Sequence, residues 1–116
     1  MKLHHVGFAT NDPKKYIDMF YKMNDTITIK KGIAEKYGAS CVFIEGENFS
    51  IELITPTKKG NHLDKFIQKR GDSLHHIAIF GKGKYKGALN NMYVDFNKIT
   101  KDNKLLIETV EVKDDM

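Results

Sequence analysis

The sequence predicts an α+β fold built from two related β-α-β-β-β modules. The first half alternates a strand pattern, a helix pattern and three further strand patterns. A second observation is an internal repeat, because LHHVGFA at 3–9 and LHHIAIF at 74–80 share Leu-His-His followed by a β-branched and a small residue. The third is that each half later carries an Ile-Glu pair, at 51–52 and at 107–108. Repetition in the same order favours a duplicated module, and 116 residues fit one domain covering 1–116.

The first module is predicted over about residues 1–58. Its first strand is 3–9, where apolar and polar residues alternate. Asp12 is a good helix N-cap and Pro13 suits the first helical position, so a helix is predicted over 13–23, where apolar residues recur at helical spacing. Three strands complete the module, with a hairpin turn at 45–48 between the last two. They are expected at 25–30, 39–45 and 49–55.

A connecting helix is predicted over 61–70, because apolar residues follow one helix face and Gly71 provides a stop. The second module is expected over about 73–113 and begins with the strand 74–80. The segment GKGKYKG follows, and it lacks the spacing of a phosphate-binding loop, so a surface turn is expected there. Two final strands are predicted at 91–96 and 104–112.

Composition and charge narrow the classes of partner. The net charge is +4 and the pI about 9.1, but acidic residues are interspersed with the lysines, which argues against a nucleic-acid-binding face. A mildly basic surface suits a small anionic substrate. No apolar run approaches the roughly 18 residues of a membrane span, and the start does not follow a signal-peptide pattern. With a single cysteine, Cys41, the sequence predicts a cytoplasmic protein.

Two histidines and two glutamates are the candidate site residues. His5 shares a strand face with Gly7, and His76 with Ala78, so a small neighbour leaves room for a ligand beside each imidazole. Glu52 and Glu108 each interrupt an apolar strand, where a carboxylate is costly unless paired or bound to metal.

Together these four side chains would bind one divalent metal ion, namely Zn, Co, Ni, Mn or Fe, and would leave positions open for water or substrate. Other interpretations of the same residues remain open. A single histidine in a strand is more often structural than a ligand, and a strand glutamate usually faces solvent. His4 and His75 are expected on the opposite strand faces, either behind the site or at the surface. Cys41 alternates within a strand, which favours a buried, inert thiol.

Four segments carry a resemblance to a known family. LHHVGFATND, FIEGENFSIELITP, LDKFIQKRGDSLHHIAIF and LLIET resemble the vicinal oxygen chelate (glyoxalase/bleomycin-resistance/dioxygenase) superfamily, most closely its methylmalonyl-CoA epimerase branch. The resemblance implies a curved mixed sheet around a cleft. Residue by residue, it implies His5, Glu52, His76 and Glu108 as the metal ligands.

The resemblance also implies a reaction. Family members remove a proton beside a metal-bound carbonyl or thioester through an enolate, as epimerases and glyoxalase I-like lyases both do. Glu108 or Glu52 would be the base, and an acyl-CoA or acyl-thiol would be the substrate. We expect an epimerase most, then a lactoylglutathione lyase-type enzyme, and as a different class a non-catalytic protein that binds a small ligand.

Two departures from the family pattern lead to further expectations. Where some members place a second carboxylate, this chain has Ser40-Cys41-Val42. The second module is short, and GKGKYKG stands where the family has a helix and a further strand. The missing helix would expose one sheet face, so we expect a second subunit, giving a homodimer, or the helix 61–70 to cover it. That face bears His75, Ile77, Ile79, Leu105 and Ile107.

Overall fold

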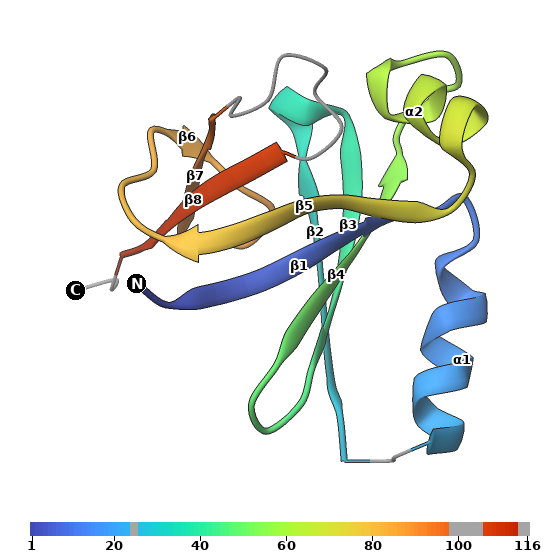
Figure 1. Cartoon of the computed structure of the whole chain (residues 1–116), viewed down its shortest axis with the longest axis horizontal. Coiled ribbons are helices and arrows are strands. Elements are labelled where there is room, and N and C mark those ends of the chain that lie inside the picture. Colours follow the sequence, from blue (N-terminus) through green and yellow to red (C-terminus); the bar gives the residue numbers. More distant parts are fainter. Residues whose placement is uncertain (24–25, 98–105, 114–116) are drawn as a thin grey trace.

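The computed structural model, which describes residues 1–23, 26–97 and 106–113, has eight strands in one curved mixed sheet with two helices (Figure 1). The strand order across the sheet is β2-β3-β4-β1-β5-β8-β7-β6. The centre of the sheet is the antiparallel pair β1 and β5, which are the two strands that carry the Leu-His-His repeat. On either side, β4 lies parallel to β1 and β8 lies parallel to β5.

The first half contains four strands, the helix α1 and one turn of 3-10 helix, η1. α1 begins at Pro13 because the preceding Asp12 accepts a hydrogen bond from the backbone N–H of Lys15 at 3.3 Å. η1 ends at Gly38, whose φ of 62° favours glycine. The bounds are β1 Leu3–Ala9, α1 Pro13–Met23, β2 Thr28–Ala34, η1 Glu35–Tyr37, β3 Ala39–Glu45 and β4 Ser50–Pro56.

The second half follows the helix α2, which spans His62–Arg70. The Asn61 side chain caps it by accepting from the N–H of Asp64 at 2.9 Å, and Gly71 ends it with a φ of 71°. Neither described helix is long and apolar enough to cross a bilayer. The strands that follow are β5 Ser73–Phe80, β6 Tyr85–Lys86, β7 Met92–Asn97 and β8 Leu106–Val112.

The two halves have the same strand order. From the edge inward, β2-β3-β4-β1 is matched by β6-β7-β8-β5, so the predicted duplication is present in the topology. Among the described residues no helix separates β5 from β6, which confirms the expected helix-poor second half. The strand expected to be missing is present, as the two-residue β6, because Tyr85 and Lys86 pair with β7.

Most of the predicted element bounds are confirmed. The strands 3–9 and 39–45 and the helix 13–23 match to the residue, and the other described bounds shift by one or two residues at either end, with one exception. That exception is the strand predicted at 25–30, which runs as Thr28–Ala34 because β2 pairs with β3 as far as Ala34 opposite Ala39. Residue 25 and residues 104–105 of the predicted strands lie outside the described residues.

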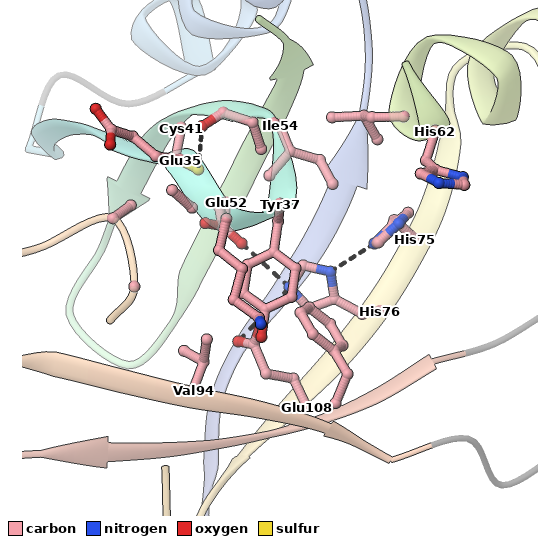
Figure 2. Close-up of a pocket in the computed structure, with 18 of the residues that line it drawn as sticks. Glu35, Tyr37, Cys41, Glu52, Ile54, His62, His75, His76, Val94 and Glu108 are labelled. Atoms are coloured by element: carbon pink, nitrogen blue, oxygen red, sulfur yellow. Dashed lines mark hydrogen bonds and ion pairs between the residues drawn. The ribbon is translucent and has the colours of Figure 1, made fainter. Parts of the chain in front are cut away.

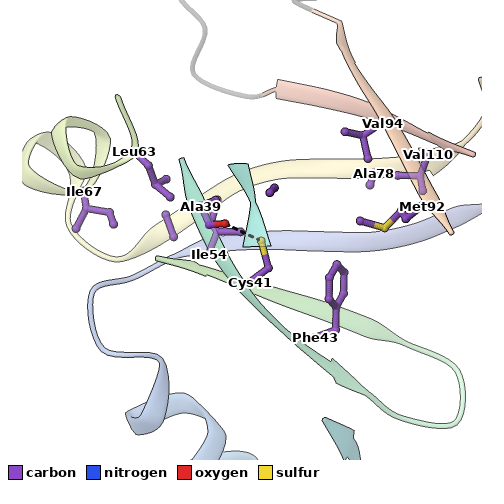
Figure 3. Packing of buried hydrophobic residues seen from close by; sticks show 12 residues of the cluster. Ala39, Cys41, Phe43, Ile54, Leu63, Ile67, Ala78, Met92, Val94 and Val110 are labelled. Carbon is purple, nitrogen blue, oxygen red and sulfur yellow. Dashed lines mark hydrogen bonds between the residues drawn. The ribbon is translucent and has the colours of Figure 1, made fainter. Parts of the chain in front are cut away.

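Two apolar clusters lie on the two faces of the sheet. The inner cluster joins both halves: Leu63 and Ile67 of α2 lie at the end with Ala39 and Ile54, and Ala78 lies at the other end with Val94 and Val110 (Figure 3). The outer cluster belongs to the first half alone, where Tyr16, Ile17 and Phe20 of α1 cover Val42, Ile44 and Leu53.

The outer face of the second half has no equivalent cover. The suggestion that the helix 61–70 covers it is wrong, because α2 packs on the inner cluster. Five residues were predicted on this face. One of them, His75, contacts α2, and its ring centre is 4.9 Å from that of Phe66. Ile77, Ile79 and Ile107 stay half-buried outside both clusters, and residue 105 lies outside the described residues. In Figure 1 both helices lie at one side of the view, away from β6, β7 and β8.

Candidate metal centre

The central strand pair brings the two candidate histidines together. In the antiparallel register of β1 and β5, His5 lies opposite Ala78 and Gly7 lies opposite His76. Both imidazoles point to the inner side of the sheet, and their Nε2 atoms are 3.0 Å apart. The contact joins residues 71 positions apart in the chain, so it depends on the pairing of the two repeats.

The two glutamates enter from the flanking strands. Glu52 of β4 lies beside Gly7 of β1, and Glu108 of β8 lies beside Ala78 of β5. Oε1 of Glu52 is 3.1 Å from both histidine Nε2 atoms. Oε1 of Glu108 is 3.3 Å from Nε2 of His5 and 3.9 Å from that of His76. The structure therefore brings all four predicted side chains to one point.

Both glutamates are buried, which rules out the alternative that they face solvent. Glu52 and Glu108 are 5% and 4% exposed, and the two histidines are 0% and 2% exposed. Two carboxylates and two imidazoles withdrawn from water together are costly unless they neutralise one another or bind a cation.

The small residues of the repeat have a different purpose from the one expected. A Cβ placed on Gly7 would lie 2.1 Å from Cε1 of His76, so Gly7 makes room for the imidazole of the opposite strand. Ala78 has the corresponding place opposite His5. The sequence correctly predicted a small residue beside each histidine. It associated Gly7 with His5 and Ala78 with His76, because the pairing of the two strands was not known.

The two carboxylates have opposite electrostatic environments. Burial by itself would raise the pKa of Glu52, but hydrogen bonds from His5 and His76 outweigh it and hold that pKa well below its usual range. Burial and then repulsion by Glu52 raise the pKa of Glu108 to about 9. In the metal-free site Glu52 is therefore the ionised partner of the histidines, and Glu108 holds a proton.

The donor set fits a divalent cation. Ligand atoms about 2.0–2.2 Å from one ion lie roughly 3 Å apart, which matches the 3.0 and 3.1 Å separations among His5, Glu52 and His76. These three residues form a group whose donor atoms all lie within 4.8 Å of one another. Oε1 of Glu108 is buried without a hydrogen-bond partner, as expected of an oxygen that would face a cation.

A cavity of about 650 Å³ opens over this cluster (Figure 2). Its walls include Tyr37 from η1, Cys41 from β3 and Phe96 from β7. Cys41 is 1% exposed and burial raises its thiol pKa, which confirms the predicted buried thiol. The sequence analysis did not anticipate Tyr37, because η1 is a single turn whose one signal is the glycine at its end. Burial, followed by the charge of Glu108, raises the pKa of Tyr37 to about 12.

His4 and His75 are not turned away from the site as regular strand alternation predicted. Nδ1 of His4 lies 2.7 Å from Nδ1 of His5, and the matching distance from His75 to His76 is 2.8 Å. Burial and the neighbouring histidine lower the pKa of His4 to about 4 and that of His75 to about 3, so both rings are neutral at pH 7.

A family model confirms the resemblance carried by the repeat. Residues 4–94 match the model described as Glyoxalase/Bleomycin resistance protein/Dioxygenase superfamily. This match covers most of the chain, and it includes both His-His strands and Glu52. The protein belongs to the glyoxalase/bleomycin resistance protein/dioxygenase superfamily.

Individual relatives are distant in sequence but close in fold. The mitochondrial methylmalonyl-CoA epimerase of Dictyostelium discoideum is 27% identical over 79 residues, covering 67% of this chain and 48% of that protein. The match spans about half the length of the curated relatives. The hypothetical protein BH1468 of Bacillus halodurans is 24% identical with a TM-score of 0.78, covering 99% of this chain and 96% of that one. A Streptomyces coelicolor methylmalonyl-CoA epimerase variant in complex with 2-nitronate-propionyl-CoA is 17% identical with a TM-score of 0.77, covering 97% of both chains.

Proposed function

We propose that this protein is a metal-dependent epimerase that removes and returns the α-proton of a 2-methyl-branched acyl-CoA. The observation that carries the proposal is the convergence of two imidazoles and two buried carboxylates at one end of a cavity. His5, Glu52 and His76 would hold one divalent ion, with Glu108 as the fourth ligand. When bound, the ion would polarise the carbonyl of the substrate thioester and make the adjacent C–H more acidic.

Glu108 is the stronger candidate for the proton-transfer group. Glu52 is tied to both histidines by hydrogen bonds, whereas one oxygen of Glu108 has no hydrogen-bond partner. A base must come within about 3 Å of the proton that it takes, and Glu108, which lines the cavity, would reach the proton by moving away from its ligand position. The apolar walls formed by Tyr37 and Phe96 would exclude water from the reacting carbon.

The rest of the cavity suits an anionic acyl-thiol substrate. Lys36 and Lys58 are among the residues that line it, and they would attract phosphate or carboxylate groups. Nζ of Lys36 lies 3.7 Å from the ring centre of Tyr85, which keeps this cation close to the cavity wall. The acyl-CoA analogue bound to the Streptomyces relative supports the same substrate class.

A lactoylglutathione lyase-type reaction is a second candidate, and Cys41 favours it. A two-base epimerase needs a proton-transfer group on each side of the substrate carbon. Cys41 lies in the cavity wall within the segment where some relatives have a carboxylate, and its raised pKa keeps the thiol protonated. A single carboxylate, Glu108, is sufficient to move a proton between neighbouring carbons.

We also propose that two copies of the chain form a dimer through the outer face of the second half, where Ile77, Ile79 and Ile107 are half-buried and no described helix covers them. A cytoplasmic location stays a prediction from cysteine content.

Metal content and α-proton exchange test the proposed function. Protein purified without chelator is expected to contain one divalent ion per chain, and the His5→Ala/His76→Ala double variant to contain none. With metal, the wild type is expected to exchange the α-proton of methylmalonyl-CoA with deuterated water and to interconvert its epimers.

The outcomes separate the candidates. Exchange without inversion, together with turnover of the methylglyoxal–glutathione hemithioacetal, would support the lyase-type reaction. A wild-type protein that takes up no cobalt, nickel or zinc would overturn both enzyme proposals and leave a protein that binds a small ligand without turnover.

A further inference from the structure

The two histidines that precede the candidate ligands make the same contact in both halves. Nδ1 of His4 faces Nδ1 of His5 at 2.7 Å, and Nδ1 of His75 faces Nδ1 of His76 at 2.8 Å. Adjacent side chains of a regular strand point to opposite faces, so their ring nitrogens do not normally meet. An irregularity of the local backbone must therefore bring the ring nitrogens of each pair together.

That feature is a pair of β-bulges. Between Leu3 and His5 the pairing advances by two residues on β1 and by one on β5, so His4 is the extra residue. The pairing shifts again between Gly7 and Phe8, and there His75 is the extra residue of β5. Bulges re-aim side chains and are frequent next to active sites. Both halves of the duplicated fold thus place a bulge at the first histidine of the repeat.

The position of the single proton on each ligand imidazole explains what these contacts could do. The Nε2 atoms of His5 and His76 converge on Oε1 of Glu52 at 3.1 Å. A neutral imidazole carries its proton on one nitrogen, and the nitrogen that ligates a metal must be free of it. In both rings the proton must then lie on Nδ1, which faces the preceding histidine.

We propose that His4 and His75 are positioning residues, each accepting the Nδ1–H of the next histidine, which orients that ring and leaves its Nε2 as the metal ligand. The inference rests on the proposed metal site. In many metal sites a carboxylate or a backbone carbonyl accepts this hydrogen bond. Here the imidazole of the preceding residue accepts it instead. This occurs once in each half, and the accepting residue lies on the same strand as the ligand.

Ring packing holds the two accepting histidines in place. The ring centres of His4 and Phe80 are 5.0 Å apart in an edge-to-face contact, and those of His75 and Phe66 are 4.9 Å apart. Each accepting ring is therefore held between an aromatic residue and the ligand histidine, so removing its nitrogen and removing its bulk are separable changes.

Leucine and asparagine variants test the proposal. His4→Leu and His75→Leu keep bulk without an acceptor, whereas His4→Asn and His75→Asn place an amide oxygen near the former Nδ1 position. His62→Leu is the matched control, because it removes an exposed imidazole from α2. Cobalt affinity is measured by absorbance against a competing chelator, and ring ¹H–¹⁵N correlation spectra of zinc-loaded protein report which nitrogen carries the proton and how fast that proton exchanges with water.

The expected result is cobalt affinity reduced about 10- to 100-fold in each leucine variant, largely restored in the asparagine variants and unchanged in His62→Leu. In zinc-loaded wild type each Nδ1–H of His5 and His76 should give a slowly exchanging signal, because it is held in a hydrogen bond, and each leucine variant should lose this slow exchange for the following ring.

Several results would overturn the proposal. These are wild-type cobalt affinity in both leucine variants, equal losses in the leucine and asparagine variants, or no slowly exchanging Nδ1–H signal of His5 and His76 in the zinc-loaded wild type. A wild-type protein that binds neither cobalt nor zinc would instead overturn the proposed function, and this inference with it, whereas metal binding that is unaffected by both leucine variants would overturn the inference alone.

Discussion

The two halves of the molecule share an inner face and differ on the outer one. Each contributes four strands in the same order, one bulged His-His pair and one buried glutamate to the cluster. On the outside, α1 covers the first half through an apolar cluster, and neither described helix covers the second. The duplication thus extends to the inner side of the sheet with its histidine–glutamate cluster, whereas the outer cover differs between the halves.

A finer difference separates the two glutamates. Glu52 is held by both histidines, but Glu108 has an oxygen without a hydrogen-bond partner and a raised pKa. Equivalent positions in a duplicated fold have therefore acquired unequal environments. Under the proposed function, this inequality would make Glu52 the residue that holds the ion and Glu108 the residue that moves the proton.

The largest expected effect separates these two roles. Glu108→Gln should reduce metal-dependent α-proton exchange by about 100-fold or more and weaken cobalt binding less, because it removes a proton-transfer group. Glu52→Gln should weaken cobalt binding more than Glu108→Gln does, since it removes the carboxylate nearest both histidines. Exchange rates at saturating metal and cobalt titrations measure both. Equal profiles for the two variants would contradict the division of roles.

A second prediction concerns the space between the central strands. Gly7→Ala places a Cβ 2.1 Å from the His76 ring, so that ring must move and cobalt affinity should fall about 10- to 100-fold. Gly81→Ala is the control, because its Cβ would meet Thr109 at 3.2 Å, away from the cluster. Both variants are measured by cobalt titration after circular dichroism has verified folding. Unchanged affinity in Gly7→Ala would show that His76 is not needed in its present position.

The uncovered outer face gives a third prediction. Ile77→Lys should shift the protein from dimer to monomer, with the dissociation constant raised at least about tenfold, because a charge would be buried at the proposed interface. Lys14→Glu on α1 is the control, since Lys14 is exposed on the covered half. Sedimentation equilibrium at several concentrations measures both. A wild type that is monomeric throughout would remove the proposed dimer and leave the metal site untouched.

The smallest expected effect is on the stability of the metal-free protein. The pKa of Glu108 is raised to about 9, so the folded state binds a proton that the unfolded chain has lost above about pH 4.5, and stability falls as pH rises between these values. Glu108→Gln should remove this loss, by about 1 to 3 kcal/mol near pH 8.5. Glu52 contributes in the opposite direction, because its lowered pKa stabilises the fold above pH 4.5 and that contribution is lost in acid.

Urea unfolding with excess chelator, at pH 5.5 and 8.5, measures this contribution. The wild type should lose more stability than Glu108→Gln between the two pH values. Parallel losses in both proteins would show that Glu108 ionises normally in the folded state.

Local sequence patterns were sufficient to predict the duplicated fold and to select the four residues that meet in the cluster. The Leu-His-His repeat predicted two equivalent strands, and Asp12-Pro13 placed the start of α1 to the residue. The isolated glutamates in apolar strands were selected as candidate site residues because burying a carboxylate has a large energetic cost, and the structure buries both beside the histidines. These are local signals, and they depend on spacing within a single strand or helix.

Features that depend on pairing between distant strands could be seen only in the folded structure. Register places Gly7 under the imidazole of His76, and the bulges turn His4 and His75 towards the ligands instead of away from them. Neither effect can be read from a strict two-residue period, because one extra residue in one strand changes the face of its neighbours. The unequal pKa values of Glu52 and Glu108 also arise there, since Glu52 depends on His5 and His76 and Glu108 depends on Glu52, and only the folded sheet brings these distant residues together.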